Sequence, residues 1–173
     1  MKTQTNADNY KCKYITPPQF DDVILFSDGE AITGLIFEKS ADVGQFSAAK
    51  IKKTAVFEKA EKWLDEYFSG KNPPVNFPVK PFASSSFRAR VYKELCEIPY
   101  GQTVSYGYLA AKIASENGTK MSAQAIGGAV GSNRLCIIIP CHRVIGANGA
   151  MVGFGGGIKN KIALLDLERQ SNK

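Results

Sequence analysis

The chain has 173 residues, of which 44% are hydrophobic and 22% charged, and this balance excludes intrinsic disorder as its main state. No window holds the apolar run that a membrane span needs, and the N-terminal segment lacks the apolar stretch of a secretory signal, so we expect a cytoplasmic protein (nuclear in a eukaryote) with no membrane partner. Basic side chains number 22 against 16 acidic ones, and the whole excess lies in residues 84–173, which carry 11 basic and 5 acidic side chains. A positive field on one half favours a polyanion such as nucleic acid.

Two strands and a helix are predicted in the first half. Apolar runs at 23–26 and 34–37 flank Ser27-Asp28-Gly29-Glu30, which favours two strands joined by a tight Asp-Gly turn. Apolar residues from Val56 to Phe68 recur at helical spacing, and Gly70 follows as a stop. Residues 71–86 hold four of the eight prolines and end in three serines, which predicts an extended linker. We expect an N-terminal α/β domain over 1–83 and a second domain over 84–173.

Three helices are predicted in the second half. Ser86 can cap the first, the second covers 103–114, and Ser122 can cap a third that runs to about Gly131. The last two resemble a helix-turn-helix unit. Glycine inside a helix costs about 1 kcal/mol relative to alanine, so the pair Gly127-Gly128 needs a compensating reason. That reason is either tight packing on the neighbouring helix or close approach to a ligand groove.

The chemistry is expected where a buried strand, 135–139, runs into Pro140-Cys141-His142-Arg143. An ordinary thiol has a pKa of about 8.5, so a nucleophilic cysteine needs an adjacent base or cation, and His142 and Arg143 supply both. The alternative is that Cys141 is a buried apolar residue and His142 a surface one. Cys12, Cys96 and Cys136 are interpreted as buried or incidental free thiols. Because no CxxC pair exists and His142 is the single histidine, we expect no metal site.

Residues 139–144, IPCHRV, resemble the active-site motif of the O6-alkylguanine-DNA alkyltransferases, single-turnover repair proteins that move an alkyl group from guanine to their own cysteine. Residues 98–106 (IPYGQTVSY), 125–133 (AIGGAVGSN) and 149–157 also resemble family segments, so the resemblance spans about 86–168. It implies a mixed α/β (α+β) fold. The N-terminal domain would be a small, ribonuclease H-like sheet with a helix, and the C-terminal domain mainly helical with a helix-turn-helix.

The resemblance also implies roles for six residues. Cys141 would accept the alkyl group, His142 would act as general base through a water, and Glu168 would orient the imidazole. Asn133 would brace the turn that presents the thiol. Tyr106 would donate to the guanine ring as the alkyl group leaves, with Lys161 nearby to favour the developing negative charge.

Duplex DNA carrying O6-alkylguanine is the implied partner of a monomeric protein that needs no cofactor. The third helix would enter the minor groove, where readout of sequence is degenerate. Gln124 stands where the family usually has an arginine finger that fills the gap left by the flipped base, so we expect weaker flipping. The resemblance assigns DNA contacts to Ser122, Gln124, Ala125, Gly127, Gly128 and Arg143, and the pocket wall to Phe154, Gly155, Gly156 and Gly157.

Three other functions are compatible with parts of the pattern. A transcription factor would use the helix-turn-helix and keep Cys141 as a structural residue. The non-catalytic branch of the family senses alkylated DNA without repairing it, but its members lack the cysteine that is present here. A cysteine hydrolase would need an oxyanion motif, and none is evident.

Overall fold

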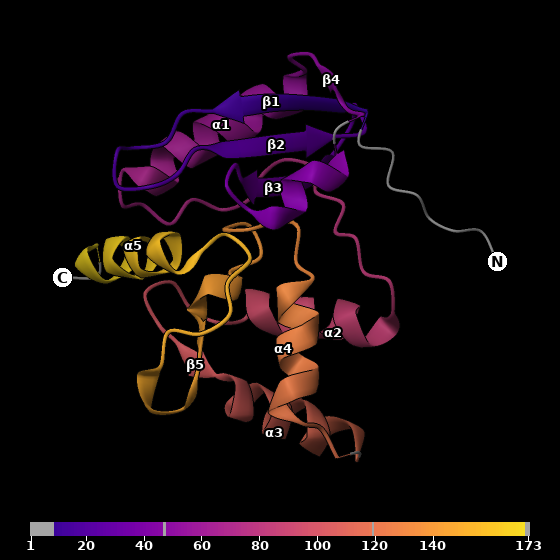
Figure 1. The fold of residues 1–173 in the computed structure, drawn as a ribbon, viewed down its shortest axis with the longest axis vertical. Helices are drawn as coiled ribbons and strands as arrows, with labels where there is room; N and C mark the ends of the chain where they lie inside the picture. The colour runs from indigo at the N-terminus through magenta and orange to yellow at the C-terminus, as the bar shows by residue number, and fades with distance from the viewer. Residues whose placement is uncertain (1–8, 47, 119, 172–173) are drawn as a thin grey trace.

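The first half of the chain forms a four-stranded sheet (Figure 1). The computed structural model describes residues 9–46, 48–118 and 120–171. The strands lie in the order β3-β2-β1-β4. β1 and β3 are both antiparallel to β2, whereas β4 runs parallel to β1. Their bounds are β1 (Tyr10–Tyr14), β2 (Val23–Ser27), β3 (Ile32–Phe37) and β4 (Lys50–Ile51).

The β2–β3 hairpin confirms the predicted Asp-Gly turn. Asp28 Oδ1 accepts hydrogen bonds from the backbone N–H groups of Glu30 at 3.0 Å and Ala31 at 2.9 Å. Gly29 has a φ of 109°, a value that side chains rarely allow, so glycine is required there. β1, which carries polar residues at alternate positions, was not predicted.

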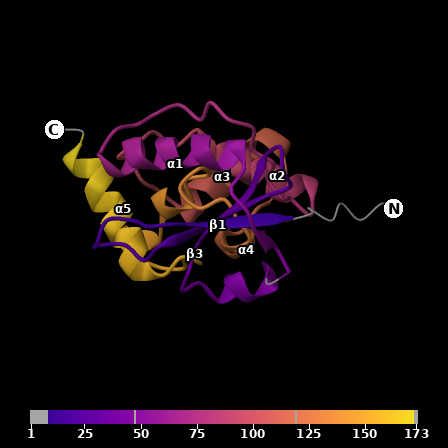
Figure 2. The ribbon, with the colours of Figure 1, turned by 90° about the horizontal axis from the view of Figure 1, so that it is seen from above.

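The alternation of side chains along the strands divides the sheet into two faces. Helix α1 (Ala55–Phe68), which the spacing of apolar residues predicted, lies along one face and packs with Val23, Leu25 and Leu35 (Figure 2). The opposite face contributes Phe26 and Ile36 to a smaller cluster, beside the 3-10 helix η1 (Ala41–Phe46). Both faces of the sheet are therefore covered.

The proline-rich segment packs on the first half of the chain. Val79 forms a β-bridge with Ile32, whose N–H donates to Pro78 O at 2.9 Å and whose carbonyl accepts from Lys80 N–H at 2.8 Å. Trp63 Nε1 donates to Pro73 O at 2.9 Å. The segment is extended as predicted, but it lies along the edge of β3 and the side of α1.

The second half is mainly helical, with serine caps at three helices. The hydroxyls of Ser85, Ser105 and Ser122 accept from backbone N–H groups three residues on, so the first cap is Ser85, one residue before the predicted Ser86. The second helix begins later than predicted because residues 104–105 form a strand. The elements are α2 (Ser86–Cys96), β5 (Val104–Ser105), α3 (Tyr106–Asn117), α4 (Ala123–Gly131), η2 (Cys141–Arg143), β6 (Val144–Ile145), η3 (Ala147–Gly149) and α5 (Ile158–Gln170).

The predicted strand over 135–139 is wrong. The segment is buried, but only its start pairs with the sheet, through Leu35 N–H to Arg134 O at 2.8 Å and Cys136 N–H to Leu35 O at 2.9 Å. The chain then turns, with Ile137 at a φ of 70° and Ile139 N–H donating to Leu135 O at 2.8 Å. A positive φ at a β-branched residue is rare, so tertiary contacts hold this turn in place.

One hydrophobic cluster runs through both halves, and it includes Leu35, Tyr67, Leu95 and Leu135. Helix α5 lies at one edge of the molecule, below the sheet and α1 and above α3 in the view of Figure 1. Its Asn160 is fully buried and donates to Asp21 Oδ2 at 2.8 Å, in the connection between β1 and β2. Within the described ranges, no helix is both long and apolar enough to cross a membrane.

Candidate active site

Cys141 begins the short helix η2, directly after the turn that replaces the predicted strand, and only 3% of it is exposed. Asn133, in the residues that follow α4, donates from Nδ2 to Ile139 O at 2.9 Å and to Cys141 Sγ at 3.0 Å. Its Oδ1 accepts from Leu135 N–H at 3.0 Å, which fixes the orientation of the amide. Asn133 therefore holds both ends of the turn and donates a hydrogen bond to the sulfur.

A buried carboxylate, Glu168 on α5, anchors the residue after the cysteine. It accepts from His142 Nε2 at 2.7 Å, Tyr67 Oη at 2.6 Å and Gly101 N–H at 2.9 Å. Arg143 adds two bonds at 2.9 Å, from Nε and Nη2. All lone pairs of this fully buried carboxylate are thereby used, which a buried charge requires.

This network fixes the protonation of His142. Burial raises the pKa of Glu168, but hydrogen bonds from His142 and Arg143 outweigh it and hold that pKa well below its usual range. A carboxylate only accepts, so Nε2 of His142 carries the proton and Nδ1 bears the lone pair. Burial lowers the pKa of His142, and the ring is neutral at pH 7. Its Nδ1 is buried without a hydrogen-bond partner among the described residues, so it is free to act as a base.

The Cys141 thiol is poised to ionise. A hydrogen bond from Cys136 lowers its pKa, burial opposes this, and Asn133 and the nearby Lys161 ammonium add to the lowering. Thiolate is the nucleophilic form of cysteine, so a depressed pKa at a buried thiol indicates a reactive residue and not a packing one.

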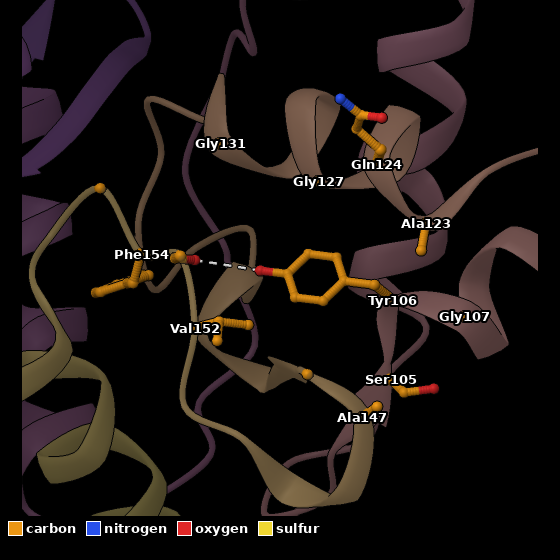
Figure 3. Close-up of a pocket in the computed structure, with 13 residues that line it drawn as sticks. Ser105, Tyr106, Gly107, Ala123, Gln124, Gly127, Gly131, Ala147, Val152 and Phe154 are labelled. Atoms are coloured by element: carbon orange, nitrogen blue, oxygen red, sulfur yellow. Dashed lines mark hydrogen bonds between the residues drawn. The ribbon is translucent and has the colours of Figure 1, made fainter.

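A cavity of about 740 Å³ opens between α4, the start of α3 and the loop that follows β6 (Figure 3). Its volume lies within the usual range for small-molecule sites. Tyr106 points across it and donates to Gly153 O at 3.2 Å. Burial and the neighbouring Cys141 charge raise the pKa of Tyr106, so the phenol stays protonated and able to donate. Cys141 itself does not line the cavity. Tyr106 does line it, and it lies close enough to Cys141 for the thiolate charge to raise its pKa.

Only part of the predicted pocket wall lines this cavity. Phe154 and Gly155 line the cavity, with Val152 and Gly153, whereas Gly156 and Gly157 do not. The Phe154 ring is turned toward Phe37 of β3, at 6.1 Å between ring centroids. Gly156 is buried against these two rings, and a Cβ there would overlap both. Close packing of the loop on the sheet explains this glycine, and contact with a ligand does not.

Two predicted basic residues are engaged inside the protein. Lys161 is fully buried and donates to Val144 O at 2.6 Å and Val152 O at 2.8 Å, so it ties the cysteine segment to the cavity loop. Arg143 was predicted to contact DNA, and the structure contradicts this. It is 8% exposed, and its guanidinium is used by Glu168 and by Ile98 O at 2.8 Å.

The predicted DNA-facing helix, α4, has an open outer surface. Ser122, Gln124 and Gly128 are exposed, and Gln124 projects from the first turn at the rim of the cavity (Figure 3). Ala125 is half-buried. An added Cβ at Gly128 would meet no atom within 4 Å, and at Gly127 only the Tyr106 ring at 4.0 Å. Packing inside the fold therefore does not explain Gly128.

Sequence reasoning missed three members of the site: Tyr67, Gly101 and Cys136. Tyr67 was identified only as an apolar position on its helix, and Gly101 contributes a backbone N–H that no side-chain pattern reveals. Cys136 was interpreted as a buried or incidental thiol, and it is indeed buried. No cluster of three His, Cys, Asp or Glu side chains able to hold a metal ion occurs in the part of the chain that the structure describes.

Comparison with known proteins identifies the family. A methylated-DNA–protein-cysteine methyltransferase of Haemophilus influenzae is 40% identical over 148 residues, which cover 85% of this chain and 80% of the relative. The chain belongs to the methylated-DNA–protein-cysteine methyltransferase family. A family relative from Methanosarcina mazei is 34% identical over 87% of this chain and 92% of its own length. The family model for the 6-O-methylguanine DNA methyltransferase, DNA binding domain, matches residues 86–170.

Solved structures of the family have the same fold. The O6-methylguanine methyltransferase of Mycobacterium tuberculosis matches with a TM-score of 0.78 and 35% identity, over 94% of this chain and 93% of that one. The same protein in complex with DNA matches with a TM-score of 0.79 and 34% identity, over 94% of each chain. The mixed α/β class predicted for the chain, a small sheet followed by a helical part, is confirmed.

Proposed function

We propose that the chain is a single-turnover DNA repair protein that transfers the alkyl group of O6-alkylguanine irreversibly to Cys141. One observation carries this proposal: a buried thiol with a lowered pKa is held by Asn133 beside a neutral histidine with a free Nδ1. This arrangement makes a nucleophile and a base, and Tyr106 adds a donor at the neighbouring cavity.

The first step is loss of the thiol proton. His142 Nδ1 takes it through a water molecule, and the imidazolium that forms is stabilised by the Glu168 carboxylate on Nε2. Arg143 and Tyr67 stay bound to the carboxylate and keep the ring in one orientation. The thiolate that remains is stabilised by Asn133 Nδ2 and by the positive charge of Lys161.

The second step is displacement at the alkyl carbon. The thiolate forms the S–C bond as the C–O6 bond breaks, and the electron pair of that bond stays on guanine. Tyr106 donates to the guanine ring as this negative charge develops. The proton removed from Cys141 ends on guanine, and the protein keeps a thioether. Because no group of the site can cleave a thioether, each molecule acts once.

The target base must leave the duplex to reach the cavity. An alkyl group on O6 lies inside the stack, so the nucleotide is flipped out. Helix α4 is the element that we assign to the minor groove, as part of a helix-turn-helix with α3. The open surface at Gly128 supports this assignment because a glycine that nothing in the fold requires allows a DNA backbone to approach closely. Ser122, Ala125 and Gly127 would lie on the same contact surface, and Gln124 would fill the gap in the stack.

The partner is thus duplex DNA carrying O6-alkylguanine, bound by a monomer in the cytoplasm. Contacts with phosphates supply most of the affinity, which makes binding strongly dependent on salt. The basic excess of residues 84–173 supports such a partner.

Intact mass spectrometry after incubation with an O6-methylguanine duplex tests the proposal. We expect the mass of one methyl group on Cys141 and no further product when substrate is in excess. Cys141→Ser should abolish transfer and retain DNA binding, since the alcohol is a far weaker nucleophile of similar shape. Binding without transfer by the wild type would favour a sensor or a transcription factor, and repeated turnover would contradict the single-use mechanism.

A further inference from the structure

A buried amide on α5 joins the cavity loop to the first half of the chain. Asn160 lies in the first turn of the helix and is fully buried. Its Nδ2 donates to Gly156 O at 2.7 Å and to Asp21 Oδ2 at 2.8 Å, and its Oδ1 accepts from Asp21 N–H at 2.9 Å. These bonds fix the orientation of the amide. The end of the loop is therefore held by a residue of the connection between β1 and β2.

Asp21 is itself held in place. Lys39 Nζ lies 2.6 Å from Asp21 Oδ1, the oxygen that Asn160 does not use. The lysine side chain is 71% exposed, whereas that of Asp21 is only 12% exposed. Bonds from Lys39 and Asn160 lower the pKa of Asp21, so the acceptor is a carboxylate at neutral pH. Hydrogen bonds to an ionised acceptor are stronger than those between neutral groups, so this anchor is a firm one.

The anchored end of the loop determines where an aromatic ring lies. Phe154, two residues before Gly156, lines the cavity, but its ring points away from Tyr106 (Figure 3). The ring packs instead against Phe37 of β3, which is fully buried. A Cβ at Gly156 would overlap both rings, so the backbone of this residue fits closely against the pair. Holding Gly156 O therefore keeps the Phe154 ring on the sheet.

The loop backbone alone does not fix the position of this ring. Glycines at 153, 155, 156 and 157 surround Phe154, and glycine adopts many backbone conformations without a steric penalty. On the other side of Phe154, Tyr106 holds Gly153 O at 3.2 Å. The cavity is lined by Tyr106 and Val152 among others, so it offers the ring a second apolar environment. The anchor at the end of the loop thus selects between two places for the ring.

We infer that Asn160 and Asp21 are specificity-determining residues, which keep the cavity wide enough for O6 adducts larger than methyl by holding the Phe154 ring outside it. This inference rests on the proposed function, in which the cavity receives the flipped base. Without the anchor, the ring enters the cavity and takes the space that a bulky adduct needs and a methyl group does not. A misfit of one methylene group in a hydrophobic pocket changes selectivity by about 10–200-fold, and a ring is larger than a methylene.

The experiment measures the ratio of the second-order rate constants for benzyl and methyl transfer from the same duplex. Asn160→Leu keeps nearly the same size and removes all three bonds, so the ratio should fall by at least about tenfold. Asp21→Ala removes only the carboxylate acceptor and should lower the ratio less. Asp21→Asn keeps an oxygen acceptor and should restore it. Unfolding of part of the protein slows both transfers equally, so a loss of stability alone does not change the ratio.

Asp22→Ala is the matched control. Asp22 lies in the same connection, pairs with Lys13 at 2.9 Å and accepts from Thr16 N–H at 3.0 Å, but none of its bonds among the described residues reaches α5. We expect the wild-type ratio from this variant. Phe154→Ala tests whether the ring is the cause, because Asn160→Leu should no longer lower the ratio when the ring is absent.

An unchanged ratio in folded Asn160→Leu would overturn the inference, as would equal falls for Asp21→Ala and Asp22→Ala or an undiminished fall in the Phe154→Ala background. If Asn160→Leu fails to fold, an unchanged ratio in Asp21→Ala refutes the inference instead.

Nuclear Overhauser contacts between the Phe37 and Phe154 rings distinguish this inference from the proposed function, because they need no substrate. We expect these contacts in the wild type and in Asp22→Ala, and their weakening in Asp21→Ala. That pattern with no alkyl transfer by the wild type would retain the anchor and refute the repair function. Contacts that stay unchanged in Asp21→Ala, with transfer by the wild type, would refute the anchor alone.

Discussion

Tyr67→Phe tests whether the first half of the chain supports the base of the reaction. Tyr67 on α1 is 2% exposed, and its hydroxyl donates to Glu168 Oε1 at 2.6 Å. A hydrogen bond to a charged group contributes about 1.5–3 kcal/mol to stability, and phenylalanine keeps the ring and leaves almost no cavity. Glu168 retains its bonds to Gly101, His142 and Arg143 in the variant, so the larger cost of an unpaired buried charge does not arise. We expect a loss of about 2 kcal/mol in the free energy of unfolding.

The chain offers a matched control in Tyr14→Phe. The Tyr14 hydroxyl donates to Asp65 Oδ1 at 2.7 Å, a bond of nearly the same length to the same kind of group, but on the exposed side of the protein. Water replaces such a bond easily, so we expect a loss below about 1 kcal/mol. Urea unfolding of both variants, compared at equal m-values, gives the two numbers.

The transfer rate of Tyr67→Phe should fall by less than about tenfold, because the remaining bonds still orient His142. Glu168→Gln should instead lose about 10²–10⁴ of the rate, the usual contribution of general base catalysis. Equal stability losses for Tyr67→Phe and Tyr14→Phe would refute the argument that the buried network differs from a surface bond.

Three further outcomes follow from the structure. Gln124→Arg should speed repair of duplex DNA and leave reaction with free O6-benzylguanine unchanged, because only the duplex requires flipping; equal effects on both substrates would place the residue inside the pocket. Gly128→Ala should stabilise the protein by up to about 1 kcal/mol, as measured by urea unfolding, and weaken binding to duplex DNA, as measured by fluorescence anisotropy. Unchanged DNA affinity would show that α4 is not part of the DNA interface. The free energy of unfolding should fall as the pH drops below about 6.5, because His142 then binds a proton in the unfolded chain but not in the folded one. It should fall further below about 4.3, because Glu168 is then protonated in the unfolded chain while the folded carboxylate stays ionised. Urea midpoints that stay constant between about pH 7.5 and 4 would contradict both pKa shifts.

Local patterns predicted the elements well where local physics decides them. The Asp-Gly turn, the amphipathic face of α1 and the Ser122 cap depend on neighbouring residues, and the structure has all three. The failures have tertiary causes. Residues 135–139 have the composition of a strand, but the backbone of β3 accepts only the start of the segment, and the rest turns toward Asn133.

In the candidate site, too, residues that are neighbours in sequence were predicted, whereas partners distant in sequence were not. The IPCHRV motif was sufficient to predict Cys141 and His142, since the two residues are adjacent in sequence. Arg143 was predicted to contact DNA because the family resemblance assigned it to the interface. Its actual partner, Glu168, lies 25 residues further on, and nothing in the spacing indicated that the pair is buried. Partners separated by long stretches of chain become visible only when the fold brings them together.

The donors to Glu168 show why the two halves of the chain function as one unit. The family model covers residues 86–170, and that range contains the cysteine, the histidine and the carboxylate. Yet Tyr67, which donates to the carboxylate, belongs to α1, and Leu35, which holds the start of the cysteine turn, belongs to β3. A segment with a positive φ at Ile137 needs such external contacts, because its own residues do not favour that conformation. Strand β3 therefore helps to position the proposed nucleophile and helix α1 the proposed base, so changes at Leu35 and Tyr67 should affect the reaction without touching the motif.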